Sequence, residues 1–180
     1  LIDIDVDAIA YCCTSGSFGG GTKWNEELAR RAAKITNVPF STTSTAVLQA
    51  LNYLKIQRLA VVTPYPDEHN SALKTFLEES DFEVVNIKGL GIMKRGGQAE
   101  VKAHEVCDIG KNTDRPDAEA LFLACTNFPT VCVIEALERN LGKPVVSANQ
   151  ATMWHMLRTV GVQDRIMGHG VLLSRDLSKA

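Results

Sequence analysis

The amino-acid sequence predicts an α/β fold built from two pseudo-symmetric lobes, each with a parallel sheet of the four-stranded type. Segments with strand and helix character alternate along the whole chain, and one motif occurs twice. Residues 5–14 read DVDAIAYCCT and residues 117–126 read DAEALFLACT, at an offset of 112 positions. Alternating strands and helices are typical of parallel sheets with right-handed crossovers, whose ligands bind at the carboxyl ends of the strands.

The repeated motif has the same plan in both copies. Each begins with acidic residues, continues as an apolar run of strand length and ends in Cys-Thr, so Cys13 and Cys125 are expected at the ends of equivalent strands. The match resumes at an offset of 105, which sets Pro39 on Pro144 and Ala46 on Ala151. The first copy is therefore seven residues longer, and we expect its glycine-rich turn to hold the excess.

The elements of the first copy follow from hydrophobic periodicity. An alternating and then apolar run predicts the first strand, and a glycine-rich turn leads into the first helix. A short strand that ends in hydroxyl residues and a helix of good helix formers complete this copy. The expected ranges are strand 1–11, turn 15–21, helix 25–34, strand 38–42 and helix 45–54.

Two further strand–helix pairs precede the second copy, which then repeats the order of the first. The continuous apolar run 58–63 is stopped by Pro64 and Pro66. The other expected elements are helix 70–80, strand 82–87, helix 98–107, strand 120–124, helix 131–139, strand 143–147 and helix 150–157.

This order predicts the division into lobes. Residues 1–44, completed by 151–180, would form the first lobe, residues 45–150 the second, and the active site would lie between them. The run 58–114 precedes the second cysteine strand but has no counterpart before the first. We therefore expect the first lobe to lack an N-terminal portion of roughly 50–60 residues, the length of two such units.

Composition excludes several classes of function. A net charge of −2 supplies no basic surface for nucleic acid, and the apolar runs are too short to span a membrane. Without a secretory pattern, a cytoplasmic location is expected. Five cysteines, an odd number, with no C-x-x-C spacing argue against both a disulfide framework and a metal site.

We expect a homo-oligomer that acts on a small carboxylic acid.

Cys13 and Cys125 are the candidate catalytic residues. A thiol at a strand-end turn that is surrounded by N–H donors can ionise readily, and a thiolate acts as a base or a nucleophile. Two thiols on opposite walls of one cleft could act on opposite faces of one carbon. The negative charge that develops on a substrate carboxyl needs fixed donors, for which the neighbouring side chains are suitable: Thr14, Ser15, Thr126 and Asn127.

Other polar residues leave alternatives open. Tyr65 follows a strand end and is either an aromatic residue at the core edge or a hydroxyl that faces the cleft. Thr42 and Thr43 either cap a helix or contact the ligand. The start of the first helix, with its glycine-rich turn, is a candidate anion site. Two groups are assigned to packing: Trp154 with His155 in packing or interface roles, and Cys12, Cys107 and Cys132 as small core residues.

Four stretches of the chain resemble one known family. They are CTSGS at 13–17, TPY at 63–65, ACTN at 124–127 and SANQATMWH at 147–155. Over nearly its whole length the chain resembles the maleate cis-trans isomerase and arylmalonate decarboxylase group of the aspartate/glutamate racemase superfamily. The resemblance implies a cofactor-independent enzyme with its site between two lobes.

The resemblance also implies roles for the site residues. In the isomerases the cysteine that matches Cys13 attacks the double bond, and the one that matches Cys125 supplies or takes a proton. In the decarboxylases the position of Cys13 is glycine. Substrate carboxylates are contacted by the residues that match Tyr65, Thr14 and Ser15. The chain departs from the isomerases after the GLGI stretch, where Arg95 either binds a second carboxylate or is solvated.

The two thiols favour a maleate-isomerase type of reaction. The alternatives are racemisation of an amino-acid-like or hydantoin-like substrate, an arylmalonate-type decarboxylation and, outside enzymes, a protein that only binds a small acid.

Overall fold

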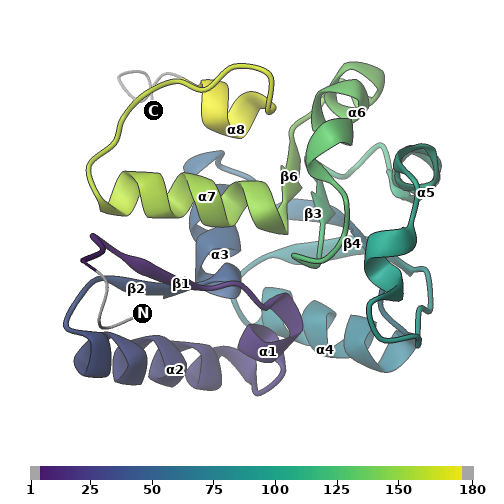
Figure 1. Ribbon diagram of the computed structural model, residues 1–180. Coiled ribbons are helices and arrows are strands. Elements are labelled where there is room, and N and C mark those ends of the chain that lie inside the picture. Colours follow the sequence, from purple (N-terminus) through teal and green to yellow (C-terminus); the bar gives the residue numbers. More distant parts are fainter. Residues whose placement is uncertain (1–4, 176–180) are drawn as a thin grey trace.

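Two parallel sheets form the centre of the protein. The computed structural model describes residues 5–175 and confirms the predicted α/β fold. The small sheet has the order β1-β2 and the larger sheet the order β4-β3-β5-β6, with every strand pair parallel (Figure 1). The strands are β1 Ile9–Tyr11, β2 Phe40–Thr42, β3 Arg58–Thr63, β4 Glu83–Gly89, β5 Ala120–Leu123 and β6 Val145–Ser147.

Helices connect successive strands, as parallel pairing requires. In the first half they are α1 Thr14–Phe18, α2 Gly21–Thr36, α3 Thr43–Tyr53 and α4 Asp67–Glu78. In the second half they are α5 Ala103–Thr113, α6 Ile134–Leu141, α7 Ala148–Thr159 and α8 Val171–Ser174, with short 3-10 turns at η1 Gly97–Glu100 and η2 Val131–Val133. No helix of residues 5–175 is long and apolar enough to cross a membrane.

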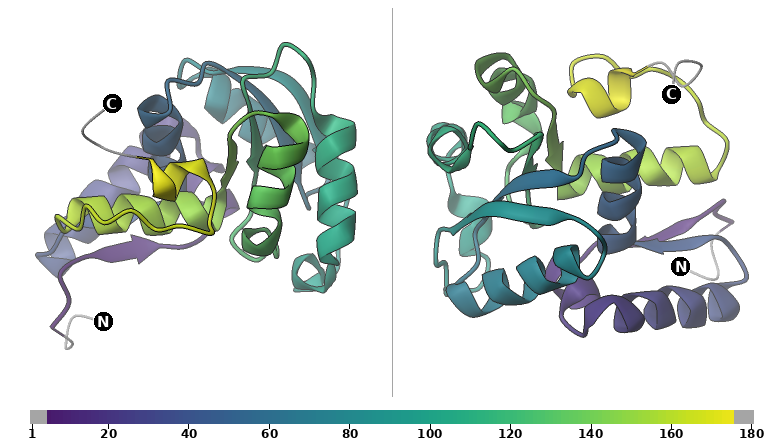
Figure 2. Two further views of the ribbon diagram at one scale, coloured as in Figure 1. Left: turned by 90° about the horizontal axis from the view of Figure 1, so that it is seen from above. Right: turned by 180° about the vertical axis from the view of Figure 1, so that it is seen from behind.

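The internal repeat is visible in the element boundaries. Shifted by 105 residues, β2 falls on β6 and α3 begins where α7 begins. Both helices are capped in the same way, because the side chains of Thr42 and Ser147 accept hydrogen bonds from the backbone N–H groups of Thr45 and Gln150. The equivalent helices α3 and α7 pack on each other between the two sheets (Figures 1 and 2).

The repeats differ in how their cysteine strands are paired. In the larger sheet β5 lies between β3 and β6, so both of its edges are hydrogen-bonded. In the small sheet β1 pairs with β2 alone among the strands of residues 5–175. The first four residues of the predicted strand 1–11 lie outside the described residues, and the strand itself begins at Ile9.

The prediction of a turn at residues 15–21 is wrong, because Thr14–Phe18 forms the short helix α1. Tertiary contacts stabilise it against its glycine content: Phe18 is fully buried, and the Ser17 hydroxyl hydrogen-bonds the Ser44 hydroxyl at 2.6 Å. The extra residues of the first copy lie in α2, which has 16 residues against 8 in α6.

The predicted helix 98–107 is also displaced. A 3-10 turn occupies Gly97–Glu100, and α5 begins only at Ala103 and continues to Thr113. The Glu105 side chain accepts a hydrogen bond from the Lys102 backbone N–H at 2.7 Å, which marks this start as a helix cap.

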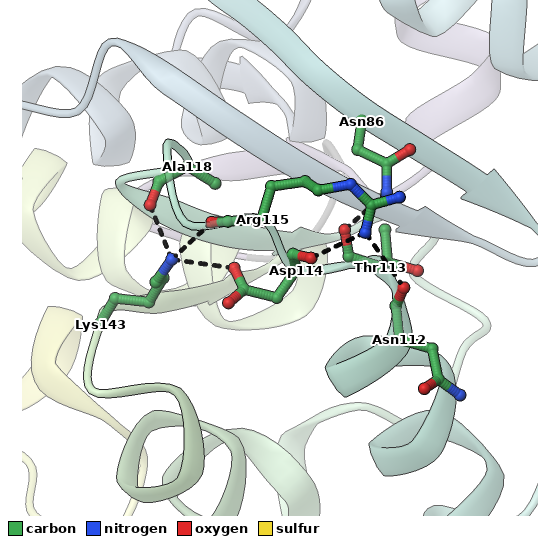
Figure 3. Close-up of polar contacts among 7 residues, drawn as sticks. All are labelled: Asn86, Asn112, Thr113, Asp114, Arg115, Ala118 and Lys143. Atoms are coloured by element: carbon green, nitrogen blue, oxygen red, sulfur yellow. Dashed lines mark hydrogen bonds and ion pairs between the residues drawn. The ribbon is translucent and has the colours of Figure 1, made fainter.

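A polar cluster closes the larger sheet at the amino ends of β5 and β6 (Figure 3). The Lys143 ammonium pairs with the Asp114 carboxylate at 3.0 Å and donates to the carbonyls of Arg115 at 2.9 Å and Ala118 at 2.8 Å. Because β5 and β6 are parallel, this cluster lies at the amino ends of the strands, and Cys125 follows the carboxyl end of β5.

Candidate active site

Cys13 and Cys125 follow the carboxyl ends of β1 and β5. Cys13 is half-buried at the N-cap of α1, and Cys125 is only 8% exposed. The two thiols are close enough to influence each other, because negative charge on Cys13 raises the pKa of Cys125. The structure thus brings together the two thiols that the repeat singled out.

The thiol of Cys125 is held in its protonated form. Burial is the main cause that raises its pKa, while contacts from the Asn127 backbone N–H and the Tyr65 hydroxyl partly oppose the effect. The Cys125 backbone has φ = 90°, in the left-handed region that non-glycine residues rarely occupy. Such uncommon backbone conformations gather at functional sites.

Tyr65 is 6% exposed, and its hydroxyl contacts the Cys125 sulfur. Burial and the nearby Cys125 thiol together raise the pKa of Tyr65 far above its usual range, so the hydroxyl remains a neutral donor. A small network holds its backbone: Tyr65 N–H donates to the Thr63 hydroxyl at 3.0 Å, and the Asn70 amide donates to the Tyr65 carbonyl at 3.3 Å.

Gly89 makes room for this network. A Cβ at Gly89 would collide with both the Asn70 amide and the Tyr65 carbonyl. Sequence reasoning included Tyr65 but missed Thr63, Asn70 and Gly89, which hold it in place.

Cys13 lies among hydroxyl groups. Its sulfur is 4.0 Å from the Ser15 hydroxyl, and its interaction with the Tyr11 hydroxyl, together with its charge, raises the pKa of Tyr11. Sequence reasoning missed Tyr11, although residues two apart on a strand point to the same side.

The Thr14 hydroxyl is buried close to the Tyr65 hydroxyl but makes no hydrogen bond of ordinary geometry among residues 5–175. The residue as a whole is 3% exposed. Thr14 lies near enough to Tyr65 to affect the pKa of that hydroxyl. A buried hydroxyl without a partner is costly, so a ligand oxygen is a natural acceptor for it.

Thr126 and Asn127, the candidates beside Cys125, have other contacts. The Thr126 hydroxyl donates to the Cys12 carbonyl at 3.0 Å and so links the two cysteine-bearing segments. Asn127 contacts the Cys125 sulfur through its backbone N–H, while its side chain is exposed.

The three candidate carboxylate contacts are placed differently from one another. Thr42 caps α3 and donates to the Asn25 side chain. The Thr43 hydroxyl lies 3.4 Å from the Tyr11 carbonyl and 3.2 Å from the Thr152 hydroxyl. Arg95 is exposed in the loop after β4. Contacts of these residues with a substrate stay a prediction.

The expected burial of the remaining cysteines is only partly correct. Cys107 is half-buried against the core, but Cys12 and Cys132 are exposed. Cys12 lines a groove of about 1080 Å³ between β1 and α7, whose lining includes neither Cys13 nor Cys125. Trp154 is buried, and its ring centroid lies 5.1 Å from that of Tyr53, in agreement with the predicted packing role.

The fold and this cluster define a class of protein: a two-sheet α/β protein with a pair of thiols at equivalent strand ends. The model of the arylmalonate decarboxylase family matches residues 1–173. The chain therefore belongs to this family.

Known relatives within this group include both decarboxylases and isomerases. The chain is 34% identical to arylmalonate decarboxylase of Bordetella bronchiseptica over 82% of its own length and 62% of the relative's. It is 27% identical to maleate isomerase of Pseudomonas putida over 97% of its own length and 72% of the relative's. It thus spans less than two thirds of the decarboxylase.

Solved structures support the same relationship. A double mutant of arylmalonate decarboxylase in a liganded form superposes with a TM-score of 0.91 at 31% identity, covering 95% of this chain and 74% of that one. A cysteine-to-alanine variant of the maleate isomerase Iso of Pseudomonas putida S16, solved with maleate, gives a TM-score of 0.91 at 27% identity, covering 94% and 70%.

Proposed function

We propose that this chain carries the active site of a cofactor-independent cis-trans isomerase of a small dicarboxylate, of the maleate-to-fumarate type. The observation that carries the proposal is the pair of thiols in unequal surroundings. Cys13 is half-buried among hydroxyls, whereas Cys125 is buried with a raised pKa. One thiol is suited to attack and the other to donate a proton.

The reaction can be written with these groups alone. The Cys13 thiolate adds to one alkene carbon, and the π electrons move to the other carbon, where the adjacent carboxylate delocalises them. The Cys125 thiol protonates that carbon, and the new single bond rotates. The Cys125 thiolate then removes the proton, the C–S bond breaks, and the trans alkene leaves with Cys13 restored as a thiolate.

Neutral hydroxyl donors would stabilise the charge on the substrate carboxylate. Thr14 has a buried hydroxyl that makes no hydrogen bond of ordinary geometry among residues 5–175, and Tyr65 stays protonated because its pKa is raised. Fixed donors aimed at developing charge are an effective catalytic device, because they need no reorganisation during the reaction. Ser15, beside Cys13, is a further candidate.

The test is to incubate the protein that contains this chain with maleate in deuterated buffer and to record proton NMR spectra. The wild-type protein should form fumarate, and the Cys13→Ser variant should not. If no fumarate forms while a chiral amino acid or hydantoin exchanges its α-proton, racemisation replaces this proposal. If neither occurs but dicarboxylates protect the thiols from alkylation, the protein is a binder.

A second candidate is decarboxylation of an arylmalonate-type substrate, which the 34% identity to a decarboxylase favours. In that reaction Cys125 alone would protonate the enediolate. Loss of carbon dioxide from phenylmalonate that survives Cys13→Gly, without any fumarate from maleate, would establish it.

A further inference from the structure

Tyr11 and Cys13 lie on one side of the chain at the end of β1. Cys12, the residue between them, lines the groove beside α7, whereas neither Tyr11 nor Cys13 does. The space in front of Tyr11 and Cys13 exists because Gly16 has no side chain. A Cβ on Gly16 would lie 2.5 Å from the Tyr11 hydroxyl oxygen and 3.0 Å from the Cys13 sulfur. The hydroxyl and the sulfur therefore both border the space that a side chain at Gly16 would fill.

The backbone around Gly16 is fixed from two sides. The Trp24 indole N–H on α2 donates to the Gly16 carbonyl at 3.0 Å. The Ser17 hydroxyl donates to the Cys13 carbonyl at 2.9 Å. These contacts fix α1, with Cys13 at its N-cap, against α2, while Tyr11, the last residue of β1, is 38% exposed.

We propose that Tyr11 is a positioning residue for Cys13, whose hydroxyl donates to the Cys13 thiolate and keeps the sulfur on the side of Cys125. A hydrogen bond to a charged acceptor is stronger than one between neutral groups, so it stabilises the thiolate over the thiol. The resulting arrangement gives each thiol its own tyrosine: Tyr65 for Cys125 and Tyr11 for Cys13. This role rests on the proposed function, in which Cys13 is the nucleophile.

The test measures the rate of iodoacetamide alkylation of each cysteine against pH, with the modified peptides quantified by mass spectrometry. In Tyr11→Phe the midpoint of the Cys13 profile should move up by about one pH unit. A less stabilised thiolate is intrinsically more reactive, so the rate at pH 7 should fall about threefold while the plateau at high pH rises about threefold. The Cys125 profile should stay unchanged.

Tyr53→Phe is the matched control, because the Tyr53 hydroxyl is buried without a hydrogen-bond partner in the described part of the chain. It should leave the Cys13 profile as in the wild type. Tyr11→Leu provides a second route, since it also removes the hydroxyl and leaves unchanged Gly16, where an added Cβ would crowd the Cys13 sulfur. It should shift the Cys13 midpoint in the same direction and by a similar amount as Tyr11→Phe.

A Cys13 profile that is identical in Tyr11→Phe and the wild type overturns the proposal, as does an equal shift in Tyr53→Phe. Should Tyr11→Phe not fold, Tyr11→Leu decides between the same two outcomes. The alkylation assay needs no substrate and does not depend on which reaction is catalysed. A failure of the Tyr11 proposal can therefore be distinguished from a failure of the proposed function.

Discussion

The ends of β1 and β5 have the same motif but place their thiols in different surroundings. Cys125 is buried, has a left-handed backbone and contacts Tyr65, which follows the neighbouring strand β3. Cys13 is half-buried at the N-cap of α1 and raises the pKa of Tyr11, the last residue of β1. Equivalent positions of the repeat therefore have different surroundings.

The comparison teaches that the division of labour lies outside the repeated motif. The pKa of Cys125 is raised chiefly by the core packed around it, and β5 is enclosed by strands on both edges. Cys13 instead lies at the start of α1, close to the Ser15 hydroxyl. Four experiments test this difference between the two thiols.

The largest effect is expected from removing either thiol. We expect Cys13→Ser and Cys125→Ser each to lower isomerisation by about 10²–10⁴-fold, because one abolishes the nucleophile and the other the proton donor. Fumarate formation measures both. Cys132→Ser, at an exposed cysteine in η2, is the control and should retain full activity. If Cys13→Ser stays active, the thiols do not work as a pair.

The second test compares the two thiols in the wild-type protein. At pH 7 Cys13 should be alkylated faster than Cys125, because Cys125 is buried and its raised pKa lowers its thiolate fraction. As the pH rises through the raised pKa of Cys125, its labelling should increase and its capacity to donate a proton should be lost. Equal rates at pH 7 would contradict the assigned roles.

A smaller effect is expected at Tyr65. Its hydroxyl lowers the pKa of Cys125 against the effect of burial, so in Tyr65→Phe the pKa of Cys125 should rise further. We expect turnover to fall about tenfold, the loss typical of one hydrogen bond of about 1.4 kcal/mol. The pH profile of Cys125 alkylation is the measurement. An unchanged profile would show that the hydroxyl does not reach the sulfur.

The smallest effect on the site is expected from a substitution in the polar cluster at the amino ends of β5 and β6. Lys143→Ala removes the hydrogen bonds to Asp114, Arg115 and Ala118 and should lower the free energy of unfolding by about 1–3 kcal/mol. Urea denaturation measures this loss. The alkylation rates of Cys13 and Cys125 should not change, and a change in only one of them would show that the distant cluster positions that thiol.

Much of the architecture was predictable because it is local. Apolar runs such as 58–63 and 120–124 have the length and composition of buried strands, and the caps at Thr42 and Ser147 mark helix starts. The predicted turn 15–21 was misjudged, because its four glycines favour a turn while the burial of Phe18 favours the helix α1. Tertiary contact outweighs local propensity there.

The candidate site divides in the same way. The repeat alone identified Cys13 and Cys125, since a strand that ends in Cys-Thr is recognisable twice in the sequence. The contact of Thr126 with a substrate stays a prediction, and the sequence did not show that its hydroxyl donates to the Cys12 carbonyl in the segment after β1. Cys12 was expected in the core but is exposed, because the alternation that points Cys13 toward the site points Cys12 toward the groove.

The sequence by itself determined the alternating fold, the duplication and the identity of the two thiols, because periodicity and spacing are properties of neighbouring residues. Only the tertiary structure decided how the thiols differ. The pKa of Cys125 depends on burial and on Tyr65, which is 60 positions away in the chain, and electrostatic effects depend on distance in space.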